Sequence, residues 1–388
     1  MLRKILADSI KRELHKLSER YIYIFAMILI PISVLLMLTS LMSEGLPLHI
    51  PTAIVDLDNT VETRAIVRNL KSSPEVEITH KVSDYSEAVQ LMKEGKIYGF
   101  FVIPYDFTRD AMAGKSVQVS YYTNSTFYIP GSLLYKSLKT TSTLTSAAVV
   151  STYLINAGAT EMQVQALLQP VKLQTNQLSN PWTHYSVYVS NSFVPCALAL
   201  MIFLVTAFSI CAEEKRGTSR EWLATSHGSM TLALIGKLLP HTVIFSAVGL
   251  FIQAYMFGFL HYPMNCSVWV MILTMLIFVV ANQALAVFIC GIVPNLRWAL
   301  SISCLLGMLS FSIGAFSFPL EQMYGGIAIF SYIIPSRYYF LIYADQALNG
   351  FPLYYSRFYF VALLAFILLP LFVAKRLKKA QLNPVYVP

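Results

Sequence analysis

The sequence predicts a membrane-embedded all-α bundle of six transmembrane helices with an α/β domain inserted after the first helix. Of its 388 residues, 56% are apolar and only 12% are charged, and the mean hydropathy is +0.59. Soluble domains carry about 25% charged residues, so this composition points to lipid. The apolar residues also gather in six long runs, and one long stretch of mixed composition separates the first run from the others.

Six stretches match the roughly 20 apolar residues that are needed to cross a bilayer. The first one follows a charged segment and is too long for the apolar core of a signal peptide, so we expect it to stay as an anchor. The predicted spans are residues 21–43, 187–212, 235–261, 266–293, 298–320 and 353–374.

Lys and Arg concentrate on one side of these spans, as the positive-inside rule requires of cytoplasmic loops. They are frequent in residues 1–20, in the loop of residues 213–234 and in the tail of residues 375–388, but residues 262–265 have none. Both termini are therefore predicted to be cytoplasmic, in a multi-pass protein of a bacterial inner membrane. This bias accounts for the net charge of +8, so the charge does not indicate a nucleic-acid partner.

The N-terminal residues 1–20 alternate apolar and basic positions, which is typical of a helix lying in the membrane interface. Two interpretations stay open, namely a simple topology anchor and a cytoplasmic elbow helix that helps to hold a partner. Residues 321–352 are apolar but are broken by glycines and Pro335, and they contain Arg337 and Asp345. Because broken backbone at membrane depth must be covered by protein, we expect a re-entrant or interfacial external hairpin here.

Residues 44–186 alternate short strand patterns with helical ones, which predicts an extracytoplasmic α/β domain. All five cysteines of the chain lie in or beside predicted spans, so no disulfide framework supports this domain. The predicted strands are residues 52–58, 76–79, 98–103 and 117–123, and the predicted helices are residues 61–70, 84–93, 129–156 and 160–169.

The loop after the second span contains the most informative motif, AEEKRGTSREWL at residues 212–223. Gly217 permits a turn, Thr218 or Ser219 is suited to cap a short helix, and Trp222 lies on that helix. An ordinary charged hairpin that merely satisfies the positive-inside rule is the alternative.

This loop resembles the signature of type-2 ABC exporter permeases, as do residues 236–240 (GKLLP), 53–60 (AIVDLDNT), 99–107 (GFFVIPYDF) and 334–336 (IPS). One departure is Ser226-His227-Gly228, where the family often has a proline. The resemblance implies a dimer that couples to a separate ATPase subunit. The coupling residues would be Glu213, Glu214, Lys215, Arg216, Gly217, Thr218, Glu221 and Trp222.

Polar side chains inside the spans are the candidates for a translocation path, because such groups are costly in lipid. The alternative is ordinary hydrogen bonding between helices, worth about 0.6 kcal/mol on average. The candidates are Asn191, Gln253, Asn282, Gln283 and Arg337.

No catalytic or metal-binding motif is present, so we expect a transporter subunit rather than an enzyme, with no cofactor of its own. ATP and Mg²⁺ would bind the partner ATPase, and the cargo would be an amphipathic, lipid-like or drug-like molecule moved outward. Other expected partners are a second permease copy or a paralogue, membrane lipid, and a periplasmic adaptor with an outer-membrane duct. A membrane receptor or envelope assembly scaffold, using the external domain for binding, is the alternative function.

Overall fold

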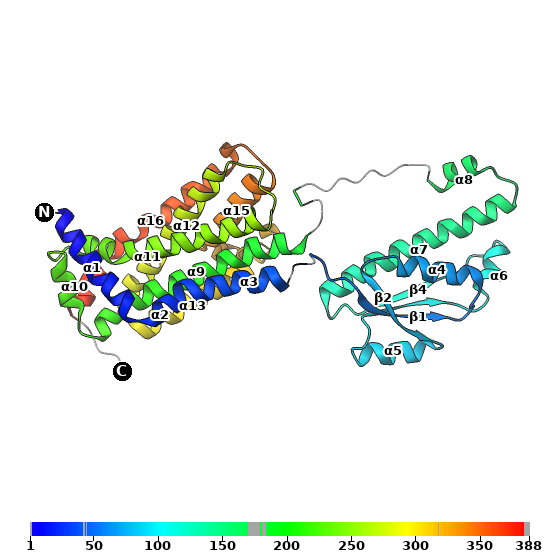
Figure 1. Cartoon of the computed structure of the whole chain (residues 1–388), viewed down its shortest axis with the longest axis horizontal. Helices are drawn as coiled ribbons and strands as arrows, with labels where there is room; N and C mark the ends of the chain where they lie inside the picture. The colour runs from blue at the N-terminus through cyan, green and yellow to red at the C-terminus, as the bar shows by residue number, and fades with distance from the viewer. Residues whose placement is uncertain are drawn as a thin grey trace. The chain divides into compact units, whose positions relative to one another are not determined.

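The computed structural model describes residues 2–41, 43, 45–169, 179–180, 184–316 and 318–383. The chain divides into two compact units, a helical unit of Met1–Gly45 and Gln177–Pro388 and an inserted unit of Leu46–Asn176 (Figure 1). The end of the predicted external domain, at residues 170–178 and 181–183, and the last five residues of the predicted tail lie outside the described residues.

Six helices in the described residues are long and apolar enough to span a membrane, which confirms the predicted helical bundle. In the first and third spans the helix includes a short π-helical stretch, η1 (Phe25–Leu29) and η2 (Ala254–Phe259). The spans are α2–η1–α3 (Tyr21–Leu41), α9 (Tyr185–Lys215), α11–η2 (Met230–Phe259), α12 (Val268–Ile292), α13 (Leu296–Ile313) and α16 (Leu353–Leu382).

Helices α9 and α12 form the centre of the helical unit. In their most apolar windows, 72% of the α9 residues and 67% of the α12 residues are buried, compared with 11% in α16. Helix α9 packs against α3, α12 and α13, and α12 packs against α16. Small residues permit this packing, since a Cβ at Gly307 of α13 would lie 2.4 Å from Leu200 Cδ1 of α9.

Two helices continue beyond the predicted spans. Helix α9 runs to Lys215. Glu213, Glu214 and Lys215 therefore belong to its last turn, whereas the sequence had suggested that they lie in a loop. Helix α16 likewise continues through the basic tail to Leu382. Once a chain leaves the apolar layer nothing forces it to unwind, and Lys is favourable near the C-terminus of a helix.

The segment before the last span is a broken pair of helices. Helix α14 (Gly325–Ser331) is followed by α15 with η4 (Pro335–Leu348), and the two are bent by 80°. Pro335 occupies the first turn of α15, where its missing N–H is harmless. The Arg337 side chain closes the bend by donating to Ser331 Oγ at 2.9 Å and lying 4.6 Å from the Tyr332 ring centroid. The predicted break is present, and its position at the membrane stays a prediction.

The inserted unit contains a four-stranded sheet in the order β2-β1-β3-β4. Strand β1 pairs in parallel with β2 and β3, whereas β3 and β4 are antiparallel. The strands are β1 (Ile50–Asp56), β2 (Val76–Val82), β3 (Gly99–Ile103) and β4 (Ser120–Thr123), and the helices are α4 (Val61–Lys71), α5 (Tyr85–Lys93), α6 (Phe107–Met112), α7 (Tyr128–Asn156) and α8 (Glu161–Leu168).

Helices cover both faces of this sheet. Helices α4 and α7 bury Leu70, Leu134 and Leu138 against Ile54 and Phe101 on one face. Helix α5 covers the opposite face, as Figure 1 shows. The two central strands, β1 and β3, therefore carry buried residues on both faces, as in other sheets that are covered on both sides.

We expect residues 46–176 to fold without the helical unit, because they bury their own core and contain no cysteine. Expressed alone, this fragment should be soluble and give a mixed α/β circular dichroism spectrum that a reducing agent leaves unchanged. A spectrum of an unfolded chain would contradict this expectation.

Candidate functional site

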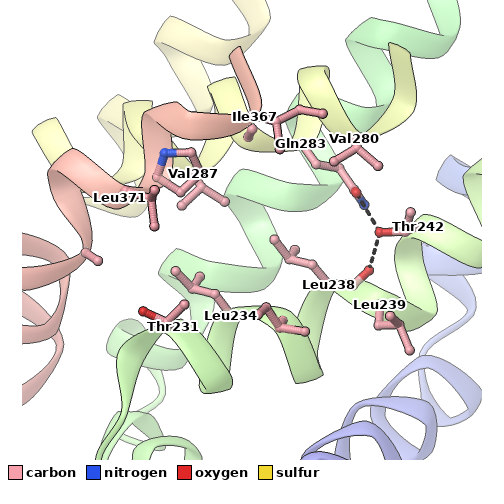
Figure 2. A pocket seen from close by; sticks show the side chains of 14 residues that line it. Thr231, Leu234, Leu238, Leu239, Thr242, Val280, Gln283, Val287, Ile367 and Leu371 are labelled. Carbon is pink, nitrogen blue, oxygen red and sulfur yellow. Dashed lines mark hydrogen bonds between the residues drawn. The ribbon is translucent and has the colours of Figure 1, made fainter. Parts of the chain in front are cut away.

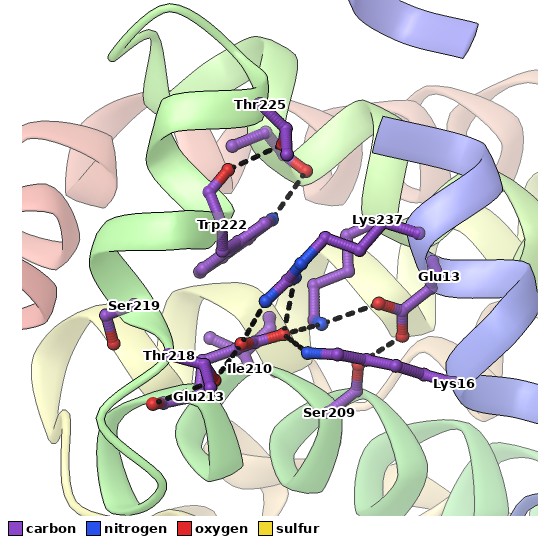
Figure 3. A network of polar contacts seen from close by, with 12 residues as sticks. Glu13, Lys16, Ser209, Ile210, Glu213, Thr218, Ser219, Trp222, Thr225 and Lys237 are labelled. Atoms are coloured by element: carbon purple, nitrogen blue, oxygen red, sulfur yellow. Dashed lines mark hydrogen bonds and ion pairs between the residues drawn. The ribbon is translucent and has the colours of Figure 1, made fainter. Parts of the chain in front are cut away.

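A buried ion cluster joins α1 (Leu2–Glu19) to α9 and α11. Lys237 Nζ lies 2.8 Å from Glu13 Oε2 and 2.7 Å from Glu213 Oε1, and all three side chains are only 2% exposed. Figure 3 shows the lysine between the two carboxylates. Three helices, of which α1 is far from the other two in the sequence, therefore meet around one ammonium group.

Two more cations of α1 complete the ion cluster, which we define as Arg12, Glu13, Lys16, Glu213 and Lys237. The guanidinium of Arg12 donates hydrogen bonds to both carboxylate oxygens of Glu213 at 3.0 Å, and Lys16 forms an ion pair with the same carboxylate. Such charge-assisted bonds are roughly twice as strong as neutral ones, and the fork of Arg12 also fixes the angle between the helices.

The carboxylate of Glu13 has two further hydrogen-bond partners. His241 Nε2 lies 2.9 Å from Oε1, and Ser209 Oγ donates to the same oxygen at 3.1 Å. Burial by itself would raise the pKa of Glu13, but the hydrogen bond with His241 and the charge of Lys237 outweigh it and lower the pKa to about 2. Glu13 is therefore ionised throughout the physiological range.

Close approach of α1 and α11 depends on a glycine. A Cβ at Gly236 would lie 2.4 Å from Ser9 Oγ, so any larger residue there would push α1 away from the bundle. The face of α1 toward the bundle carries Ser9, Glu13 and Leu17, all buried. Helix α1 therefore packs against the bundle, and its role as an elbow helix that holds a partner stays a prediction.

The short helix α10 (Ser219–Thr225) is anchored on the same end of the bundle. Trp222 is 1% exposed, donates from Nε1 to the Ala233 carbonyl at 3.3 Å and has Lys237 Nζ 5.1 Å from its ring centroid. Ser219 Oγ donates to Gln381 Oε1 of α16. The ring of Trp222 therefore packs into the chain itself, and its part in coupling to an ATPase stays a prediction.

The turn before α10 contains the predicted glycine, but the threonine after it does not cap the helix with its side chain. Gly217 has φ +70°, as a tight turn requires of glycine. Thr218, expected to cap α10, instead donates its hydroxyl to Glu213 Oε2 and so ties the turn to the ion cluster. Glu214 is half-buried, and the exposed residues of this segment are Lys215, Arg216, Gly217, Arg220, Glu221, Ala224 and His227.

The family model of the ABC-2 family transporter protein matches residues 21–374, which is most of the chain. The chain belongs to this family. A search of curated proteins gives no match. The resemblance of the loop motifs to type-2 ABC permeases is thus confirmed, and membership implies a separate ABC ATPase as partner.

The five translocation candidates of this ABC-2 permease do not form one polar path. Asn191 and Asn282 donate to carbonyls of their own helices, and Gln253 Nε2 donates to the Met271 carbonyl and to Tyr339 Oη. Arg337 closes the bend between α14 and α15. Gln283 contacts Thr242 of α11 and lines a cavity. Only Gln253 and Gln283 among them make hydrogen bonds between spans in the described residues, and a role of the five residues in transport stays a prediction.

Glu13 and His241 were not among the residues that the sequence indicated, and Lys237 appeared only within the GKLLP motif. One signal for this part of the ABC-2 permease was available. Lys237 and His241 are four residues apart, so they share a helix face inside the predicted span 235–261. Ionisable residues within a span are a functional hypothesis by default, and this pair required an acidic partner.

Proposed function

We propose that this chain is the permease subunit of an ATP-driven exporter that moves an amphipathic, lipid-like or drug-like molecule outward across the bacterial inner membrane. Membership of the ABC-2 family supports the permease role and the ATPase partner. The contacts of α10 with α11 and α16, together with the ion cluster that joins α1 to α9 and α11, carry the coupling part of the proposal.

In this proposal the ATPase binds the exposed side chains around α10, among them Arg220 and Glu221. Movement of the ATPase shifts α10, and α10 cannot move alone because Trp222 and Ser219 fix it to α11 and α16. The ion cluster passes the displacement to α9 and α11. A partner can shift such an equilibrium only through contacts that differ between the two states, and the surface of α10 supplies them.

The test is purification in mild detergent followed by transport in vesicles. An ABC ATPase should co-purify, and the pair should accumulate an amphipathic dye in an ATP-dependent manner. A receptor or scaffold would instead bind a ligand through residues 46–176 without any ATPase. Absence of the ATPase from every preparation that keeps the chain folded would contradict the exporter.

The orientation in this proposal predicts labelling by a membrane-impermeant thiol reagent. In a cysteine-free background, single cysteines at the exposed positions Lys4, Arg220 and Lys379 should resist reagent added from outside, whereas those at Lys96 and Gln322 should react. The buried Ser219 would be a poor reporter. Reaction of a cysteine at position 220 with reagent added to intact cells would contradict the proposed orientation and indicate the opposite one.

A further inference from the structure

A cavity of about 390 Å³ lies between α11, α12 and α16 (Figure 2). Three of its lining residues, Thr231, Thr242 and Gln283, are polar and uncharged, and the others are aliphatic or proline side chains. The cavity follows α11 from Thr231 to Thr242, a rise of about 16 Å at 1.5 Å per residue. It is therefore long enough to take an extended chain.

The cavity opens on the outer surface of the helical unit. Three of its lining side chains are well exposed, Ile235 at 46%, Leu239 at 43% and Leu371 at 62%. They belong to α11 and α16, which are both long and apolar enough to span a membrane. The mouth thus faces the apolar layer, from which a molecule can enter sideways.

One buried polar group in the cavity has an unused hydrogen-bond donor. Gln283 is 3% exposed, and its Oε1 accepts a hydrogen bond from Thr242 Oγ1 at 2.7 Å. Its Nε2 has no hydrogen-bond partner in the described part of the chain. A buried donor without an acceptor is unfavourable, so an acceptor on a ligand would stabilise this arrangement.

We propose that this cavity binds the apolar chain of an amphipathic molecule whose uncharged oxygen, as in an ester or an amide, accepts a hydrogen bond from Gln283 Nε2. The lining carries no charge that could neutralise a charged group, so the buried part of the ligand must be uncharged. The site requires neither a direction of transport nor a bound ATPase, so it can be tested separately from the exporter proposal.

The first experiment uses the full chain in phosphatidylcholine vesicles that contain a small fraction of phosphatidylcholine with a diazirine in one acyl chain. Photolabelling should concentrate on peptides with residues 231–242 and 280–287. Ala284→Phe, or Val280→Phe if the first variant does not insert, fills the cavity and should remove most of this labelling. Leu273→Phe, at an exposed position of the same helix outside the cavity, is the matched control and should label as the wild type does.

The second experiment tests the hydrogen bond by competition. Methyl laurate should displace the photoreactive lipid better than dodecane does. Gln283→Leu should lower the affinity for methyl laurate by about tenfold, or about 1.4 kcal/mol, and should leave the affinity for dodecane unchanged. This variant leaves Thr242 paired, because its single hydroxyl proton, which Gln283 Oε1 and the Leu238 carbonyl share in the wild type, can still be donated to that carbonyl.

The outcomes separate the two sources of such a ligand. Displacement by methyl laurate indicates a site for small amphipathic molecules, whereas labelling that resists it indicates a resident membrane lipid, and both support the site. Three results would overturn the site. They are labelling spread evenly over exposed helix faces, labelling of Ala284→Phe equal to that of the wild type, and crosslinks to a second copy of the chain.

Discussion

Lys237→Met should destabilise the helical unit by about 3–5 kcal/mol, the usual cost of removing one partner from a buried ion pair. Lys237 is the shared counter-charge of Glu13 and Glu213, which are themselves 2% exposed. Glu213 would keep Arg12 and Lys16, whereas Glu13 would keep only the neutral contact with Ser209 and the contact with His241 among its described partners. The loss of stability should therefore come mainly from the contact between α1 and α11.

The measurement is the midpoint of thermal aggregation of the purified protein in detergent. A loss of this size corresponds to a drop of about 6–20 °C, if the helical unit follows the roughly 2–4 °C per kcal/mol of domains of about 150–250 residues. Lys16→Met is the matched control, because its side chain is 21% exposed and Glu213 keeps two other cations. The double variant Lys237→Met with Glu13→Gln should regain part of the loss. Equal midpoints for wild type and Lys237→Met would show that the ion cluster does not hold the helices together.

The pH dependence of the thermal midpoint should differ between the wild type and Lys237→Met. In the wild type the pKa of Glu13 is lowered from 4.5 to about 2, so its stabilising effect is complete above about pH 4.5 and is lost as the pH falls through 2. Between pH 5 and 8 this group should leave the midpoint unchanged. In Lys237→Met a proton on Glu13 would remove the uncompensated charge, so stability should rise as the pH falls.

The six spans could be predicted because each one depends on a local run of apolar residues long enough to cross a bilayer. The strands of the inserted unit could be located for a similar reason, since strand alternation and the turns that bound it are local. The ion cluster could not be predicted in this way. Glu13 and Lys237 are 224 positions apart, and nothing local indicates which cation will meet which carboxylate.

Trp222 illustrates a second limit. A Trp on a short amphipathic helix marks a contact surface, but the sequence does not say whether the partner is another protein or the chain itself. Here the aliphatic side chains of α11 and the ammonium of Lys237 occupy the site next to the ring, so the chain supplies the contact. The residues left for a partner are the polar ones on the other side of α10, chiefly Arg220 and Glu221.

Reversing these two charges, Arg220→Glu with Glu221→Lys, should lower substrate-stimulated ATPase activity and transport by about tenfold or more. Charged pairs at an interface discriminate strongly between partners, and like charges brought together there cost several kcal/mol. Both side chains are exposed and belong to no ion pair in the described residues, so folding and membrane insertion should be unchanged. The measurement is ATPase activity and dye transport at equal membrane abundance.

Two comparisons decide what such a loss means. Arg297→Glu reverses an exposed charge in the first turn of α13, just after the short loop that follows α12, and should leave activity close to that of the wild type. Trp222→Ala should lower activity too, but together with the thermal midpoint, because it opens a cavity under α10 at a cost of about 3–5 kcal/mol. A charge-reversed protein that is as stable as the wild type yet uncoupled would place the ATPase on α10. Normal transport by that protein would mean that the ATPase binds elsewhere and that α10 serves only to close the end of the bundle.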